Sequence, residues 1–158
     1  MGPGARAALN GVARAVDAFP FMNESSVQDS AALPLGVGID LVEIPRLEGS
    51  LQRTGEVFLS KVYHPRELEG LPPNSARRLE YLAGRWAAKE AFSKALGTGI
   101  TERCALKEIC VLNREDGSPV MTLEGAALRT AEERGVKRIL LSISHEKNYA
   151  TAIVLLLG

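Results

Sequence analysis

A long helical segment from residue 76 to residue 96 constrains the fold of this chain more than any other feature. The segment contains no proline, and it follows Pro72-Pro73-Asn74-Ser75, which predicts a loop that ends in a helix N-cap. The glycines of Gly97-Thr98-Gly99 predict the end of the helix. In a chain of 158 residues, one such helix is a main element of the fold.

Short apolar segments on both sides of the long helix predict the strands of a sheet. The first, from Leu35 to Ile44, is rich in β-branched residues and ends at Pro45. Asp116-Gly117 lies between two further strands and predicts a hairpin turn. The other predicted strands cover residues 109–112, 119–123, 138–144 and 149–156, and shorter helices are expected over 46–53, after Pro65 and over 125–134. The sequence therefore predicts an α+β domain with a mainly antiparallel sheet packed on one long helix.

The size and composition of the chain favour one domain. With 158 residues, 46% of them hydrophobic, the chain is long enough for one core and too short for two domains. We predict that this domain covers residues 34–158. Residues 1–33 are rich in Ala, Gly and Ser and contain no acid before Asp17. We interpret them as a disordered or non-native extension, with Met22 as an alternative start, rather than as a transit peptide.

Charge and cysteine content exclude several classes of protein. The net charge is zero, with 19 basic and 19 acidic residues, so we expect neither a nucleic-acid partner nor a membrane partner. The apolar segment from Ala150 to Leu157 is about half the length of a membrane-spanning helix and predicts a strand. Cys104 and Cys110 fit neither a redox pair nor a zinc site, and reduced thiols are expected. These features predict a soluble, cytoplasmic protein.

Two charges of the long helix lie on its apolar stripe. At about 100° per residue, the stripe that contains Leu79, Ala83 and Trp86 also contains Glu90, and Lys94 continues it. This phase places Glu90 and Lys94 toward the interior or the edge of a cleft. The alternative is an exposed ion pair between these two residues, worth a few tenths of a kcal/mol.

An adjoining stripe of the same helix carries Arg78, Arg85 and Lys89. Their spacings of seven and four residues place them on one side of the helix. We expect this stripe to present a row of cations beside the cleft.

Asp40 is the candidate for a second carboxylate beside Glu90. It lies in the first apolar strand, directly after Gly36-Val37-Gly38, where the glycines permit close approach of another backbone or a ligand. The alternative is an aspartate that caps a neighbouring helix. Two carboxylates without histidine or thiolate partners favour Mg²⁺, which completes its shell with water and substrate phosphate oxygens.

His145 follows a β-branched strand that also contains Ser142 and Ser144. It lies at a turn, where ligand-binding and catalytic side chains are common. A polar residue that only satisfies its own hydrogen bonds is the alternative.

Three blocks of residues resemble the acyl carrier protein synthase type of 4'-phosphopantetheinyl transferase, in the order and at the spacing of that family. The resemblance covers about residues 35–157. The first block is Gly36-Val37-Gly38-Ile39-Asp40 with Glu43, Arg46, Phe58 and Arg66-Glu67-Leu68, the second runs from Arg85 to Ile100, and the third is Ser142-Ile143-Ser144-His145 with Tyr149-Ala150. The chain differs from short bacterial members in its N-terminal extension, and it has Trp86 where Phe is also familiar.

This resemblance implies a role for each matched residue. Asp40 and Glu90 would be the Mg²⁺ ligands, and Glu90 would act, directly or through a water, as the general base. Lys94 would stabilise or protonate the departing phosphate. The remaining predicted contacts with coenzyme A are Arg85 and His145 at the nucleotide phosphates, Arg77 or Arg78 at the 3'-phosphate, and Gly97, Thr98 and Gly99 along the channel wall.

The same resemblance implies an activity and partners. The enzyme would transfer 4'-phosphopantetheine from coenzyme A to a serine of an acyl carrier protein, for fatty acid or polyketide biosynthesis. It would be a homotrimer with active sites at subunit boundaries, and the carrier would dock near Arg46, with Arg53 as a weaker match. Two competing hypotheses are a binding module without turnover and a Mg²⁺-dependent pyrophosphate hydrolase. The sequence does not show which carrier protein is the physiological substrate.

Overall fold

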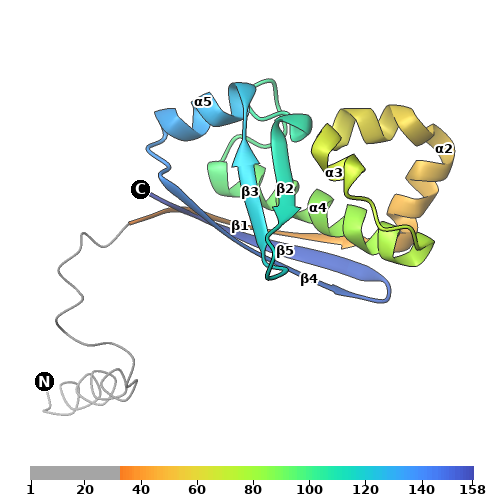
Figure 1. The fold of residues 1–158 in the computed structure, drawn as a ribbon. Helices are drawn as coiled ribbons and strands as arrows, with labels where there is room; N and C mark the ends of the chain where they lie inside the picture. Colours follow the sequence, from red (N-terminus) through yellow and green to blue (C-terminus); the bar gives the residue numbers. More distant parts are fainter. Residues whose placement is uncertain (1–32) are drawn as a thin grey trace, which may run out of the picture. The chain divides into compact units, whose positions relative to one another are not determined.

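Three antiparallel strands form the larger of two sheets in the computed structural model, which describes residues 33–158. They are β1 (Pro34–Glu43), β4 (Arg138–Glu146) and β5 (Tyr149–Leu157), in the order β1-β5-β4 (Figure 1). The prediction made for residues 1–33 lies outside the described residues, apart from Leu33.

Alternate residues of β1 point to opposite faces of this sheet. On one face Val37, Ile39 and Leu41 are 63% to 64% exposed, an unusual exposure for apolar strand residues. Exposed apolar side chains of the neighbouring strands, Leu140 and Ile153, add to the same face. The opposite face, which includes Gly38 and Asp40, faces the long helix.

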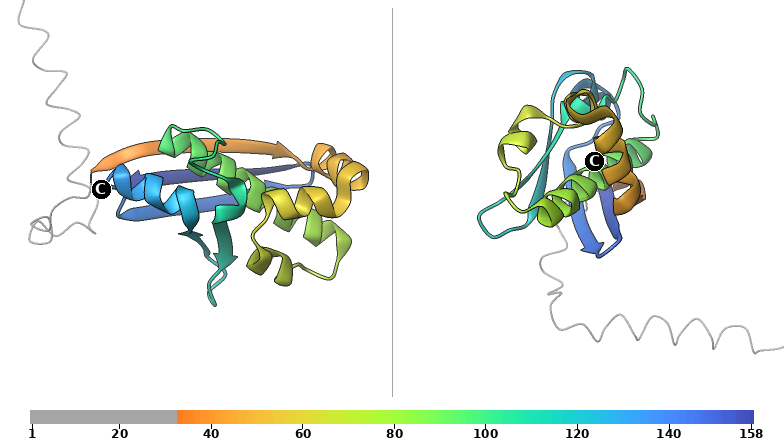
Figure 2. Two further views of the ribbon diagram at one scale, coloured as in Figure 1. Left: turned by 90° about the horizontal axis from the view of Figure 1, so that it is seen from above. Right: turned by 90° about the vertical axis from the view of Figure 1, so that its right-hand side faces the viewer.

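Helix α4 (Ser75–Leu96) is the predicted long helix, and it packs against β1 and β5 (Figure 2). Its N-cap is Asn74, whose side chain accepts a hydrogen bond from the Arg77 backbone, so the helix starts one residue before the predicted position. It ends at Gly97, which adopts the left-handed conformation at φ 70° that favours glycine.

The glycines of β1 set the distance between this strand and α4. A Cβ atom on Gly38 would overlap the carbonyl oxygen of Ala91 and lie 2.6 Å from the backbone nitrogen of Ala95. A Cβ atom on Gly36 would overlap the carbonyl oxygen of Ala95. The predicted close approach of another backbone to these glycines is therefore confirmed, and that backbone is α4.

Helix α2 (Ile44–Val62) follows β1 directly and is longer than the predicted 46–53. It is interrupted by Gly55, whose φ of 47° and ψ of −123° are not helical, so two helical pieces meet there at a kink. The prediction covered only the first piece. Helix α3 (Pro65–Glu69) has His64 as its N-cap, and His64 forms a reciprocal capping box with Glu67.

The second half of the chain adds a hairpin and a short helix. Strands β2 (Ile109–Asn113) and β3 (Pro119–Leu123) pair with each other, with Gly117 at φ 83° in their turn, and η2 (Leu106–Glu108) precedes them. Helix α5 (Gly125–Glu133) leads into β4. Figure 1 shows the helices and the hairpin on one face of the three-stranded sheet. The α+β prediction is confirmed, with the predicted strands divided between two antiparallel sheets.

The core lies on both sides of α4. One cluster joins Ala91 and Phe92 to the inner faces of β5 and the hairpin, and a second joins Leu82 and Ala83 to α2. Within residues 33–158, no helix is long and apolar enough to cross a membrane.

Candidate functional site

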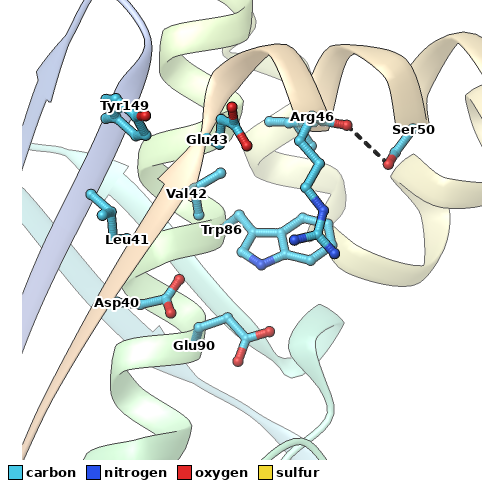
Figure 3. Close-up of a pocket in the computed structure, with 10 residues that line it drawn as sticks. Asp40, Leu41, Val42, Glu43, Arg46, Ser50, Trp86, Glu90 and Tyr149 are labelled. Atoms are coloured by element: carbon cyan, nitrogen blue, oxygen red, sulfur yellow. Dashed lines mark hydrogen bonds between the residues drawn. The ribbon is translucent and has the colours of Figure 1, made fainter.

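A pocket of about 520 Å³ opens between β1, α2 and α4 (Figure 3). Two of the predicted site residues, Asp40 and Glu90, are among the residues that line it. Polar and apolar side chains share its wall, and the lining residues are Asp40, Leu41, Val42, Glu43, Arg46, Leu47, Ser50, Trp86, Glu90 and Tyr149.

Lys94 forms an ion pair with Asp40 at the edge of this pocket. Its Nζ donates to Asp40 Oδ1 at 2.8 Å and to the carbonyl oxygen of Ile39 at 3.1 Å. No ion pair joins Glu90 to Lys94 in the described part of the chain, so the alternative of an exposed pair between them is wrong. The Asp40 carboxylate accepts from Lys94 and caps no helix of the described structure, so the capping alternative is wrong as well.

The environment of Glu90 disfavours an uncompensated negative charge. Burial is the main cause that raises the pKa of this carboxyl, the neighbouring Asp40 carboxylate raises it further, and Lys94 and Trp86 act in the opposite direction. The site therefore has two carboxylates and one ammonium group, and a bound cation would stabilise it.

The donor set fits Mg²⁺ better than a softer metal. Asp40 and Glu90 supply oxygen atoms only, and residues 33–158 contain no group of three or more His, Cys, Asp and Glu side chains that could hold a metal ion. Mg²⁺ is usually held by one or two carboxylates together with waters and substrate phosphates. A pocket of this size beside the two carboxylates leaves room for a phosphate group.

Trp86 forms the wall of the pocket one helical turn before Glu90. Its indole stacks on Phe58, with ring centroids 4.9 Å apart and an interplanar angle of 18°. Figure 3 shows the indole nitrogen on the side of the ring that faces Glu90. Trp86 is the only tryptophan of the sequence, so it is also a spectroscopic probe of this pocket.

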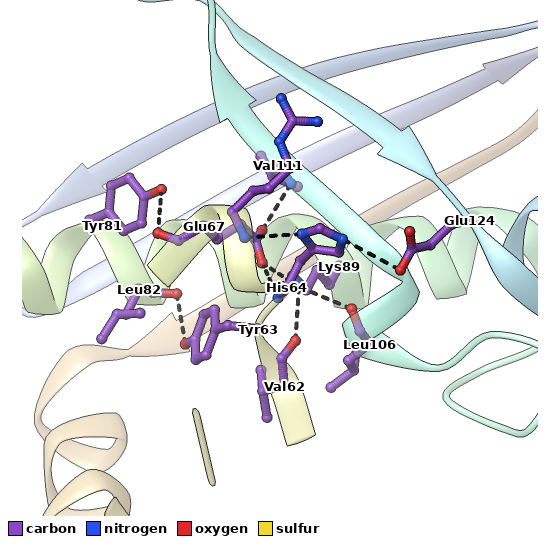
Figure 4. A network of polar contacts seen from close by, with 11 residues as sticks. Val62, Tyr63, His64, Glu67, Tyr81, Leu82, Lys89, Leu106, Val111 and Glu124 are labelled. Atoms are coloured by element: carbon purple, nitrogen blue, oxygen red, sulfur yellow. Dashed lines mark hydrogen bonds and ion pairs between the residues drawn. The ribbon is translucent and has the colours of Figure 1, made fainter. Parts of the chain in front are cut away.

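The predicted row of cations beside the cleft is wrong for two of its three members, because Lys89 and Arg85 are buried. Lys89 pairs with Glu67 at 2.7 Å, and both side chains are fully buried (Figure 4). Helical spacing shows which residues share a side of α4, but not how many sides are covered. The sheet covers one side of α4, and α3, η2 and β2 cover the side of Lys89.

The sequence analysis missed the buried role of Glu67. Its carboxylate accepts from the backbone of His64 and of Val111 as well as from Lys89. Pro65 signalled a helix start, and a glutamate at its third position fits a capping box, but no local signal pointed to the partner on α4.

Arg85 lies outside the lining of the pocket. Its guanidinium covers the Tyr81 ring at 3.6 Å and donates to Asn113 Oδ1 at 2.7 Å. Burial is the main cause that lowers its pKa. Its Nε has no hydrogen-bond partner within residues 33–158. The contact of Arg85 with a nucleotide phosphate stays a prediction.

The other predicted coenzyme A contacts divide between the two ends of α4. Arg77 is exposed in the first turn, and His145 lies nearby, with Nδ1 4.0 Å from Glu80 Oε2. Gly97, Thr98 and Gly99 follow the last turn, where the Thr98 hydroxyl donates to the Gly99 carbonyl. At about 1.5 Å per residue, Arg77 and Gly97 are about 30 Å apart along the helix. One chain does not bring these two groups together.

Comparisons with known proteins give a consistent result. Residues 36–154 match the model of the 4'-phosphopantetheinyl transferase superfamily. The chain is 47% identical over 119 residues to a holo-[acyl-carrier-protein] synthase of Halothermothrix orenii, a match that covers 75% of this chain and 94% of that protein.

Solved structures of proteins with the same name are also similar. The holo-[acyl-carrier-protein] synthase of Neisseria meningitidis matches with a TM-score of 0.73 and 33% identity, over 78% of this chain and 98% of that one. That of Bacillus anthracis, solved in complex with CoA (3',5'-ADP), matches with a TM-score of 0.66 and 35% identity, over 80% of this chain and 99% of that one.

Proposed function

Because the chain belongs to the 4'-phosphopantetheinyl transferase superfamily, we propose that it transfers the 4'-phosphopantetheine group of coenzyme A to a serine of an apo-acyl carrier protein. The serine oxygen forms a bond to the phosphorus that carries pantetheine. The pyrophosphate bond breaks, and adenosine 3',5'-bisphosphate leaves. The observation that carries this proposal is that Asp40 and Glu90 line one pocket and that Lys94 forms an ion pair with Asp40.

Asp40 and Glu90 would hold a Mg²⁺ ion, which when bound neutralises charge on the pyrophosphate oxygens. Glu90 would take the proton of the carrier serine, because its carboxylate lines the pocket and is not paired with Lys94 in the described structure. Lys94 is half-exposed at the edge of the pocket, where its ammonium group faces negative charge on the departing phosphate. The main task of the protein is to position the two substrates.

The carrier would dock on α2, which forms one wall of the pocket. Arg46 is exposed at the pocket rim, and Arg53 lies two turns later with its guanidinium donating to Ser50 at 3.2 Å. Exposed arginines at the entrance favour an acidic partner and speed its encounter.

The proposed homotrimer is supported by two observations on the described residues. The exposed apolar face of β1, with Val37, Ile39 and Leu41, is typical of a surface that another subunit covers. The predicted coenzyme A contacts lie at opposite ends of α4, so one substrate would use one group from each of two subunits. This arrangement supports active sites at subunit boundaries.

A mass measurement on the carrier tests the function. Purified enzyme is incubated with coenzyme A and Mg²⁺, with and without apo-acyl carrier protein. We expect the carrier to gain one phosphopantetheine group, and adenosine 3',5'-bisphosphate to appear only when the carrier is present. Release without the carrier would indicate a pyrophosphate hydrolase, and coenzyme A binding without any product would indicate a binding module.

A further inference from the structure

The ion pair between Lys94 and Asp40 uses an oxygen atom that a metal ion would also use. Asp40 Oδ1 accepts from Lys94 Nζ at 2.8 Å, and the Asp40 side chain is 15% exposed, so its oxygens are reached mainly from the pocket. An ammonium group is a compact point charge, and a Mg²⁺ ion binds carboxylate oxygens at about 2.0–2.1 Å. Two cations in direct contact with one carboxylate repel each other.

We propose that Lys94 competes with the divalent cation for Asp40, and that cation binding turns the Lys94 ammonium from the carboxylate toward the substrate phosphate. This inference rests on the proposed function, because it assumes the metal site of the transferase. Lys94 is thus a positioning residue for the cation as well as a group that faces the leaving phosphate.

The surroundings of Lys94 permit such a change of partner. The Lys94 side chain is 52% exposed, so the ammonium group can move without losing a packed environment. Its second contact, to the carbonyl oxygen of Ile39 at 3.1 Å, does not depend on Asp40. A lysine that keeps this contact stays at the pocket edge after it leaves the carboxylate.

The charge balance of the site supports the competition. Asp40 and Glu90 carry two negative charges when ionised, and Lys94 is the cation that pairs with Asp40 in the described structure. The Lys94 ammonium therefore neutralises part of the charge that would attract a metal ion. Loss of this ammonium should tighten metal binding, although the same change lowers catalysis.

The test is a binding titration with Mn²⁺, a paramagnetic substitute for Mg²⁺, without coenzyme A. Free Mn²⁺ is measured by electron paramagnetic resonance, and quenching of Trp86 fluorescence reports occupancy of this pocket. The variants are Lys94→Met, which removes the charge and keeps the apolar stem, and Lys94→Arg, which keeps the charge. Lys137→Met is the matched control, because Lys137 is exposed and lies outside the pocket lining.

We expect Lys94→Met to bind Mn²⁺ about threefold to tenfold more tightly than the unmodified protein. In this variant the Asp40 carboxylate no longer has to break its ion pair with Lys94, and no ammonium group repels the metal ion. Lys94→Arg and Lys137→Met should bind Mn²⁺ as the unmodified protein does. Thermal melts confirm that each variant is folded.

Unchanged or weaker Mn²⁺ binding by folded Lys94→Met would overturn the competition. Asp40→Asn separates this failure from a failure of the metal site. Loss of Mn²⁺ binding in Asp40→Asn, together with an unchanged affinity in Lys94→Met, would refute the competition and leave the metal site supported. Unchanged binding in Asp40→Asn would remove the metal site and the competition with it, whereas the transferase activity is decided by the carrier assay.

Discussion

The buried ion pair of Lys89 and Glu67 leads to a quantitative stability prediction. Lys89 Nζ donates to the carbonyl oxygens of Val62 and Leu106 at 2.8 and 3.0 Å, in addition to its 2.7 Å contact with Glu67. The pair therefore joins the end of α2, the start of α3, η2 and β2 to the long helix, as Figure 4 shows. Burial is the main cause that lowers the pKa of Lys89, and Glu67 acts against it.

Removal of one partner of this buried pair should lower the free energy of unfolding far more than removal of a surface charge. Lys89→Met leaves the Glu67 carboxylate buried without its cation, which costs about 3–5 kcal/mol in the free energy of unfolding. Glu67→Gln removes the charge and turns one acceptor into a donor, which no longer suits the backbone N–H of His64. The double variant removes both charges, so it should be more stable than the sum of the single losses predicts, by about 2 kcal/mol.

The assay is urea denaturation of the two single variants, the double variant and the unmodified protein, at one protein concentration. Lys107→Met is the control, because Lys107 is exposed and should change the free energy of unfolding by less than about 0.5 kcal/mol. Additive losses in the double variant, or a loss below about 1 kcal/mol for Lys89→Met, would refute the coupling of the buried pair.

Four further predictions concern the pocket, the docking of the carrier and the packing of β1 on α4. Glu90→Gln should abolish transfer, and an unchanged rate of transfer would exclude this residue from the mechanism. Without metal, the same variant should melt at a higher temperature than the unmodified protein at neutral pH, because the raised pKa of Glu90 means that folding disfavours its ionised form. Lys94→Met should lower kcat more than it changes the Kd of coenzyme A, and steady-state kinetics with a binding titration checks this. Arg46→Glu should raise the KM for the carrier and flatten its salt dependence while the affinity for coenzyme A is kept; equal losses for both substrates would contradict a docking role. Gly38→Ala should destabilise the fold by about 3 kcal/mol or more, whereas Gly49→Ala within α2 should be neutral or stabilise it by up to about 1 kcal/mol, as measured by urea denaturation.

Much of the site could be predicted because two local rules converge on it. The helical phase of Trp86 and Glu90 identified the side of α4 that borders the pocket. The glycines before Asp40 indicated which strand approaches another part of the chain closely, and that part is α4. Each rule depends on neighbouring residues only, so both are readable without the fold. The antiparallel strands were predicted for the same reason.

The features that escaped prediction depend on contacts between distant segments. The burial of Lys89 requires Glu67 and two carbonyl groups from other elements, and nothing in the sequence near Lys89 reveals them. The second half of α2 was not predicted, and the structure shows that the chain resumes a helix after one non-helical residue, Gly55. The division of the strands into two sheets also depends on pairing over long distances.

The approach of β1 to α4 limits how mutations at this site can be repaired. The atoms that a side chain at Gly38 would meet belong to the backbone of Ala91 and Ala95, not to their side chains. A smaller residue at either helix position therefore cannot make room for a larger one on the strand. A genetic screen for intragenic suppressors of Gly38→Ala should accordingly recover reversion to glycine, and no compensating change at residues 91 or 95.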